Sequence, residues 1–335
     1  MTIRTILFIL TCSAISRAQS QPINVTGTYR FTTPMTEQGL REAATIVRTV
    51  ASLPQVSPDI PNASLSFSGS EEAVSLAAWI LPQIDKVSGD TAIHEYKLPS
   101  GDVSRVNFIT NARNAQDLQE LLTILRTVAD VQKVYNFTPN RALVLRGPAW
   151  QVAFSEWIIQ QLAEPAAQNP DTAPREFAVG GPDYRGTGHG ARFNFLSNVT
   201  SIQQMQEILT VLRTVADIQK IFNYTSRNAL VLRGGDSDLQ RAEWLIQQLD
   251  LPARQSSGPA TFSASTGDDV TRIFRLRNVA PQSLQTAVTG MRSELGIKKI
   301  FPTTTTNPAT IVLRGTSDQM AAAVTWMTAH NALIE

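Results

Sequence analysis

Apolar positions between residues 118 and 146 change spacing from the period of a helix to that of a strand. The first part repeats leucine at three- and four-residue intervals, as an amphipathic helix does, at Leu118, Leu121, Leu122 and Leu125. Two runs rich in β-branched and aromatic residues follow, 131–137 and 142–146, joined by the turn sequence Thr-Pro-Asn-Arg. A leading strand is predicted at 105–109, and a second helix is expected to run to about Leu162. This order predicts a β-α-β-β-α unit.

The predicted strands carry apolar side chains on both faces. Tyr135 and Phe137 alternate with Val134 on one strand, and Leu143 alternates with Val144 on the next. A three-stranded sheet covered by helices on one side needs only one apolar face. The surplus predicts that the second face is covered as well, by the neighbouring repeat, by a leading hairpin or by a partner protein.

The same pattern occurs four times. Residues 119–147 and 206–234 are identical at 20 of 29 positions, and six of the nine differences exchange similar apolar or aromatic residues, which preserves packing. Arg-Thr-Val-Ala begins at Arg48, Arg126 and Arg213, each time 21 residues before a glycine and 31 before a tryptophan. The C-terminal part keeps this frame with small slips. We therefore predict an α+β chain of four tandem β-α-β-β-α modules, the first the most divergent, at 28–86, 103–163, 190–250 and 270–333.

Composition changes between the predicted units. Residues 164–190 are rich in Pro, Gly and Ala, and residues 252–269 are rich in Ser, Thr and Gly. Both segments are typical of linkers or loose hairpins. A hairpin is also predicted at 94–108, ahead of the second unit, with Ser100-Gly101-Asp102 at its turn.

Tryptophans and arginines recur at matching places and form a candidate interaction surface together with the strand aromatics. The second-helix tryptophans of the first three units point away from the apolar stripe of that helix. They either anchor contacts between repeats or with a partner, or pack against the unit's own first helix. The arginines that end the third strands either bind carboxylates or are solvated charges. The candidate residues are Trp79, Trp157, Trp244, Tyr135, Phe137, Phe222, Tyr224, Arg146, Arg233 and Arg314.

Residues 1–18 have the pattern of a secretory signal peptide. Arg4 precedes an apolar stretch at 6–12, and small residues precede an expected cleavage after Ala18. A lipoprotein modified at Cys12 is the alternative, although Thr11 is bulky for the residue before a lipidated cysteine. We expect a periplasmic or secreted protein with no transmembrane segment in the mature chain.

Removal of the signal peptide would change the charge and the cysteine content. Cys12 is the only cysteine, so the processed chain would have no disulfide, cysteine metal site or thiol nucleophile. Without Arg4 and Arg17 the chain keeps 27 basic and 28 acidic residues, a net charge of −1. This neutral balance argues against nucleic acid and against an anionic membrane face as partners.

No catalytic or metal-binding constellation emerges from the sequence. His94, His189 and His330 lie in different units without partners at metal-ligand spacing. The Gly-Thr-Gly-His-Gly stretch around His189 lacks the Lys-Ser/Thr of a phosphate-binding loop. Recurring carboxylates such as Asp130 and Asp217 are interpreted as solvated charges. We predict a protein that is not an enzyme and that binds no cofactor, metal or nucleic acid.

The unit resembles the short N-terminal periplasmic domain of secretins. The resemblance rests on Asn228-Ala-Leu-Val-Leu-Arg-Gly234 and Leu245-Ile-Gln-Gln-Leu-Asp250, with weaker matches at 140–162 and 307–326. It implies a KH-like topology without the Gly-x-x-Gly loop, and domains that stack, form rings and dock envelope components. The pore-forming β domain that follows in secretins has no counterpart in these 335 residues, so only the interaction role is carried over.

Two functions are the main candidates from the sequence, and an unrecognised hydrolase built on loops such as 180–190 is a third hypothesis. The first is a non-catalytic exported repeat protein that mediates protein–protein contacts in the cell envelope, with a secretin pore, an inner-membrane platform or another copy as partner. The alternative is a periplasmic ligand-binding or signal-sensing module similar to the short domain of outer-membrane transporters. A deep apolar pocket between units, with converging polar groups, would favour the alternative.

Overall fold

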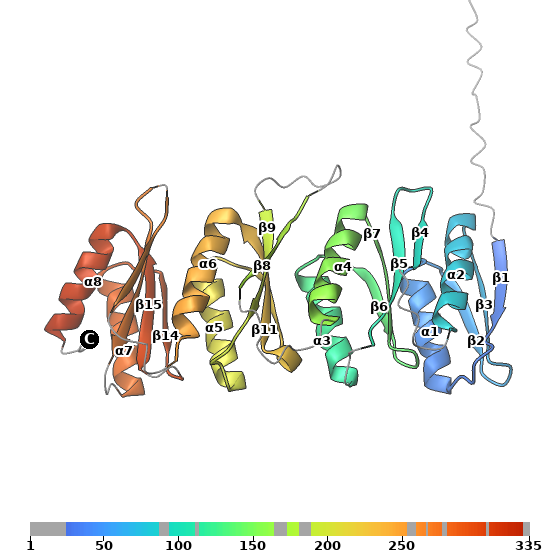
Figure 1. Ribbon diagram of the computed structural model, residues 1–335, viewed down its shortest axis with the longest axis horizontal. Coiled ribbons are helices and arrows are strands. Elements are labelled where there is room, and N and C mark those ends of the chain that lie inside the picture. The colour runs from blue at the N-terminus through green and yellow to red at the C-terminus, as the bar shows by residue number, and fades with distance from the viewer. Residues whose placement is uncertain are drawn as a thin grey trace, which may run out of the picture.

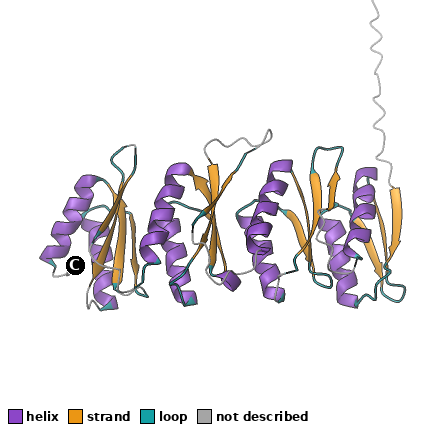
Figure 2. Ribbon diagram, in the orientation of Figure 1, coloured by secondary structure: helices purple, strands orange, loops and turns teal. Residues whose placement is uncertain are grey.

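The computed structural model shows four modules stacked in a row, each an antiparallel sheet with two helices on one face (Figures 1 and 2). The described residues are 25–86, 94–110, 114–163, 173–180, 189–252, 259–265, 267–276, 280–305 and 308–330. The predicted signal peptide and Cys12 lie outside them. Within these segments, no helix combines the length and apolar character needed to cross a bilayer.

Module 1 has the predicted β-α-β-β-α order. Its elements are β1 (Val25–Arg30), α1 (Glu37–Thr49), β2 (Gln55–Asp59), β3 (Ser64–Gly69) and α2 (Glu71–Ile84). The strand order is β1-β3-β2, with both pairs antiparallel.

Modules 2 to 4 share this order but begin with one additional strand, which pairs with the edge that β1 occupies in module 1. Their sheets are ordered β4-β5-β7-β6, β8-β9-β11-β10 and β12-β13-β15-β14. Module 2 contains β4 (His94–Lys97), β5 (Val103–Phe108), α3 (Ala115–Thr127), β6 (Lys133–Phe137), β7 (Ala142–Gly147) and α4 (Ala149–Ala163). Module 3 contains β8 (Arg175–Ala178), β9 (His189–Phe195), α5 (Ile202–Thr214), β10 (Lys220–Tyr224), a 3-10 turn (Thr225–Arg227), β11 (Ala229–Gly235) and α6 (Asp236–Leu249). Module 4 contains β12 (Ala260–Ser263), β13 (Val270–Leu276), α7 (Pro281–Glu294), β14 (Lys299–Thr303), β15 (Ala309–Gly315) and α8 (Ser317–Ala329).

The additional first strands of modules 3 and 4 lie within segments that the sequence predicts as linkers or loose hairpins. The hairpin predicted ahead of the second unit is confirmed, with β4 and β5 joined through Gly101 at a positive φ of 90°. The segments 164–190 and 252–269 contain β8 and β12, so both hold a strand of the following sheet. These strands are only four residues long and alternate half-buried with exposed positions, which is too short a pattern to detect among Pro, Gly and Ser.

Side chains at the helix starts satisfy free backbone N–H groups. Thr36, Ser70 and Asn114 each accept a hydrogen bond from the backbone N–H three residues later. The capping box expected at Ser201 and Gln204 is present, with both reciprocal bonds formed.

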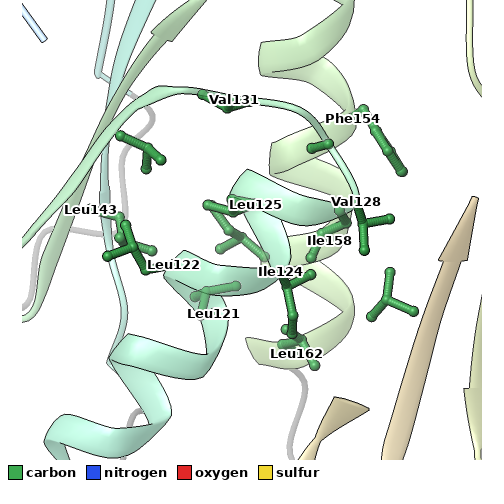
Figure 3. Close-up of a cluster of buried hydrophobic side chains, with 14 of the residues drawn as sticks. Leu121, Leu122, Ile124, Leu125, Val128, Val131, Leu143, Phe154, Ile158 and Leu162 are labelled. Atoms are coloured by element: carbon green, nitrogen blue, oxygen red, sulfur yellow. The ribbon is translucent and has the colours of Figure 1, made fainter. Parts of the chain in front are cut away.

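The second apolar face of the sheets of modules 2 to 4 is covered by the helices of the preceding module. The core of module 2 shows this clearly, because side chains from α3 and α4 (Figure 3) belong to the same cluster as Phe193 and Val231 from the sheet of module 3. The core of module 1 likewise includes Val106 and Val144 of module 2. The core of module 3 includes Ile273 of module 4. Of the three coverings that the sequence allowed, the neighbouring repeat is the one observed.

Each module also protects one open edge of its sheet with an arginine. The arginine of the first helix donates from Nη2 to the carbonyl oxygen of the edge-strand residue eight positions later, at 2.5, 2.9, 3.2 and 2.9 Å in modules 1 to 4. The four pairs are Arg48–Val56, Arg126–Val134, Arg213–Ile221 and Arg292–Ile300. Unpaired edges invite strand addition from other chains, and charged side chains discourage it. This contact explains why the arginine recurs in all four modules.

Replacing Arg126 with Met should destabilise the protein by about 1 kcal/mol, because one carbonyl of the edge strand β6 loses its hydrogen bond. It should also increase self-association, because the edge becomes available for pairing. Urea denaturation and sedimentation velocity would measure the two effects. Arg41→Met is the control, since Arg41 makes only an exposed contact with Glu37 within its own helix. Equal behaviour of the two variants would contradict a protective role for Arg126.

Candidate functional site: the contacts between modules

Each module boundary is formed by a stripe of two residues on the first helix of one module and the residue that caps the C-terminus of that helix, and this stripe faces the next sheet. The three stripes are Glu42-Ile46-Val50, Glu120-Ile124-Val128 and Glu207-Val211-Val215, each with four-residue spacing along one helix face. The two apolar members of every stripe are fully buried. We call each of these triplets a docking stripe. Because burying an aliphatic side chain contributes about 1.5–3 kcal/mol, each stripe is a substantial part of its boundary.

The opposing surface is a row of three residues that lie side by side across three strands of the next sheet. The rows are Val106–Val144–Tyr135, Phe193–Val231–Phe222 and Ile273–Val312–Phe301. We call each of these a docking row. Tyr135 and Phe222 of the candidate surface therefore lie in docking rows and are half-buried. Phe137 and Tyr224 lie two residues further along the same strands and are 0% and 5% exposed.

The glutamate that begins each docking stripe caps the turn between the second and third strands of the next module. Glu42 accepts a hydrogen bond from the backbone N–H of Thr138 at 2.8 Å, and Glu120 accepts one from Thr225 at 2.8 Å. Glu207 accepts from the N–H groups of Thr304 and Thr305 at 3.0–3.1 Å. The glutamate carboxylate fixes how far one module can slide along the next, because its hydrogen bonds form only when the N–H groups of the turn lie directly opposite it.

Asp130 and Asp217 pair with basic side chains of the next module. Asp130 contacts Lys220 and Arg233. Asp217 contacts Lys299 and also Arg314, the latter at 2.7 Å. The expectation that these aspartates are solvated charges was wrong. Both adopt a positive φ, near 60°, which Asp tolerates better than most residues.

The electrostatics of Asp130 reflect this pairing. Burial by itself would raise the pKa of the Asp130 carboxyl group. Hydrogen bonds from Lys220 and Arg233 outweigh that effect, with their positive charges adding to it, and the pKa is lowered below its ordinary value. The charged form of Asp130 is therefore stabilised in the folded protein.

The candidate arginines are paired at the boundaries. Arg146 is 8% exposed and contacts Asp102 of its own module at 2.8 Å and Glu72 of module 1 at 3.0 Å. Arg233 is also 8% exposed and contacts Asp130. The interpretation as solvated strand-end charges was wrong, and the alternative, carboxylate binding, describes the contacts. Ser52 stands in module 1 where Asp130 stands in module 2, so Arg146 pairs with other carboxylates.

At the third boundary Asp269 joins two arginines from different modules. It accepts from Arg241 of module 3 at 2.7 Å and from Arg314 of module 4 at 2.7–2.8 Å. The hydrogen bond with Arg314 lowers the pKa of Asp269 despite partial burial of its carboxyl group. Arg241 is 1% exposed, and its guanidinium carbon lies 5.7 Å from the ring of Phe262.

The three candidate tryptophans pack on an aromatic residue in the leading strand of the next module. The ring centroids lie 5.4 Å apart for Trp79–Tyr96, 5.4 Å for Trp157–Phe177 and 5.7 Å for Trp244–Phe262. These tryptophans thus lie between repeats, as the first of the two interpretations had it. Packing against the own first helix is seen instead for Trp326 of module 4, which lies over Gly290 of α7.

Sequence reasoning missed the partners of these residues. Glu42, Glu120 and Glu207 each precede the recurring arginine by six residues, a spacing that could have identified them. The leading-strand aromatics lie in segments without detectable repetition, so no sequence signal indicated them. Within the described residues, no group of three or more His, Cys, Asp or Glu side chains converges on a possible metal position.

Two open pockets lie among the described residues. One of about 300 Å³ lies in module 3 beside the exposed side chain of Ile202. Another of about 230 Å³ lies between modules 1 and 2 and is lined by residues that include Thr36, Glu42 and Thr138. Glu42 already binds the backbone of Thr138, so the second pocket offers few free polar groups.

Comparison with known proteins identifies no family. No protein-family model matches the chain, and no curated protein matches it. Among solved structures, the ETEC pilotin–secretin AspS–GspD complex is 13% identical with a TM-score of 0.17, over 90% of this chain and 54% of that chain. Aeromonas hydrophila ExeD is 14% identical with a TM-score of 0.17, over 88% and 60%. Aspartate kinase from Synechocystis is 11% identical with the same TM-score, over 92% and 53%.

The chain thus spans less than two thirds of each of these structures. At this TM-score, the similarity supports no conclusion about fold or function.

Replacing Trp157 with Ala should lower the free energy of unfolding by about 3 kcal/mol, because its ring packs on both Phe154 and Phe177. A double-mutant cycle with Phe177→Ala should give a coupling of about 1 kcal/mol across the boundary between modules 2 and 3. Urea denaturation would measure both values. Ile202→Ala, at a side chain that is 73% exposed, is the control and should have little effect. Full additivity of Trp157→Ala and Phe177→Ala would argue against the contact.

Asp130→Asn should destabilise the protein by about 1–2 kcal/mol at neutral pH, because Lys220 and Arg233 lose their charged partner. Since the folded-state pKa of Asp130 is lowered, its contribution is present above the unfolded pKa, near 4, and is lost as pH falls through the folded value. The stability difference between the two proteins should therefore shrink on acidification. Denaturation at pH 7 and pH 3 would show this.

The control for Asp130→Asn is Glu37→Gln, which removes an ion pair with both side chains more than half exposed. It should change stability by less than about 0.5 kcal/mol at either pH. A pH-independent difference between wild type and Asp130→Asn would contradict the assigned role of the Asp130 charge.

Proposed function

We propose that the protein is a non-catalytic scaffold that mediates protein–protein contacts in the cell envelope, as an accessory of a secretin-type machine. The observation that carries the proposal is the sharing of each core with the next module. Because the sheet of one module completes the core of the module before it, the four modules act as one extended body. An extended body of this kind is better suited to holding other proteins at a fixed spacing than to catalysis.

The location and the class of partner rest on the sequence. The signal-peptide pattern supports export, and the secretin-like motif supports a place among envelope machinery. One similar structure is a pilotin–secretin complex, but at a TM-score of 0.17 this similarity adds no weight to the choice. Near-neutral charge supports protein partners over nucleic acid or anionic membranes.

The candidate residues at the module boundaries are occupied, so partners are expected on the long sides of the stack. Equivalent exposed positions line these sides: Gln119 and Gln206 on the first helices, and Ala153 and Gln240 on the second helices. These positions repeat from module 2 to module 3 and allow each side to be examined separately. The ligand-binding alternative gains no support from the pocket between modules 1 and 2, because this pocket is open and the Glu42 carboxylate in its wall already binds the backbone of Thr138.

The test is photo-crosslinking in the native cell envelope, with a crosslinking amino acid at 119, 206, 153 or 240 of the full-length tagged protein. We expect adducts with a secretin or its inner-membrane platform from one side of the stack, identified by mass spectrometry. Buried Leu122 is the control position and should give none. Absence of intermolecular adducts at all four exposed positions, with the protein exported and intact, would contradict the proposal.

A further inference from the structure

The two end faces of the stack differ from the internal boundaries at the positions that form those boundaries. In module 1 the row equivalent to a docking row is Thr28–Ser66–Ser57, read from the same cross-strand pairing. All three side chains are exposed and polar. The internal rows carry Val, Ile, Phe or Tyr at each of these places.

The difference extends to the next row of the same sheet. Module 1 has Arg30–Ser64–Asp59 where module 2 has Phe108–Ala142–Phe137. Gln55 and Ser68 replace the basic pair that binds aspartate in modules 3 and 4. The outer sheet face of module 1 therefore offers neither the apolar surface nor the cations of a docking face.

The helix at the other end shows the complementary change. Arg292 is equivalent to Arg213 because each donates to an edge-strand carbonyl eight residues later. This alignment places Thr286, Gly290 and Glu294 where α5 has Glu207, Val211 and Val215, so the docking stripe is replaced throughout. Gly296, with φ 65°, stands where Asp217 reaches across its boundary.

Trp326 covers the position that the stripe would use. Its ring lies over Gly290, where an added Cβ would come within 2.3 Å of it. Its indole Nε1–H donates to Oε2 of Glu294 at 2.7 Å. Its ring stacks on the His330 ring, with the two centroids 3.9 Å apart. The apolar ring thus closes the outer face of α7 within module 4.

We infer that these substitutions close both ends of the stack, so that copies of the chain do not add end to end. Docking module 1 of one copy on α7 of another would dehydrate Glu294 and several hydroxyl groups without burying a docking row. Burial of polar groups without new partners is unfavourable, and heterologous contacts of this kind otherwise lead to open filaments. Terminal repeats with polar outer faces serve the same purpose in other repeat proteins. The inference does not depend on the identity of any envelope partner.

The test uses two variants of the full chain that restore a docking face at one end each. The sheet variant carries Thr28→Phe, Ser57→Phe, Asp59→Tyr, Ser66→Val, Gln55→Lys and Ser68→Arg, the residues of module 3. The helix variant carries Thr286→Glu, Gly290→Val, Glu294→Val, Gly296→Asp and Trp326→Ala. Circular dichroism checks folding, and light scattering after size exclusion measures mass.

We expect wild type and each variant alone to stay monomeric, and an equimolar mixture of the two variants to form a complex of about twice the monomer mass. Wild type mixed with either variant is the control and should not associate. The inference would be overturned if wild type itself associated end to end and the substitutions of the helix variant altered that association. A mixture of two folded variants that remains monomeric would also overturn it.

A milder helix variant guards against loss of folding. Glu294→Val with Gly296→Asp leaves Gly290 and Trp326 in place and restores one apolar residue and the bridging aspartate. Mixed with the sheet variant, it should associate more weakly than the full helix variant but measurably. Absence of association between these folded partners at high concentration would likewise overturn the inference.

Discussion

The structure depends on sheets that are apolar on both faces. Two helices cover only one face of a sheet of three or four strands, so modules 2 to 4 each present a second apolar face that only the preceding module covers. Val144 and Val231 are fully buried although the helices of their own modules lie on the opposite side of the sheet. The stability of one module is therefore tied to its neighbour, as in other repeat proteins, where interface terms add to the intrinsic stability of each unit.

Polar contacts around this apolar boundary determine its geometry. The glutamate of each docking stripe needs a turn N–H opposite it, and Asp130 and Asp217 need a lysine and an arginine from the next sheet. Apolar surfaces alone tolerate sliding, whereas hydrogen-bonded carboxylates do not, because a shifted register would leave partly buried charges without partners. The near-identity of residues 119–147 and 206–234 reflects this requirement. In each segment the helix contacts the following module and the strands contact the preceding one.

The order of elements within a unit could be predicted from sequence because it depends on local periodicity and turn chemistry. The apolar stripe of α3, the capping box at Ser201 and the double-sided strands all led to correct elements. The short leading strands β8 and β12 could not be predicted, because four residues with a weak alternation depend on the sheet beside them. The ion pairs were misjudged for a related reason. A single sequence shows that Asp130 and Arg233 recur in adjacent units but not that the boundary brings them together.

The same comparison of equivalent positions separates packing from specificity. Positions that keep their chemistry in all four modules, such as the edge-protecting arginines, serve each module by itself. Positions that change only at the ends, such as Val215 against Glu294, serve the boundary, because they are apolar only where another sheet follows. The polar ends are thus evidence that the apolar rows inside are maintained for docking and not merely for folding of single modules. In the proposed scaffold, closed ends leave the long sides of the stack for partner proteins, so the chemistry of those sides is where we expect partner recognition to be encoded.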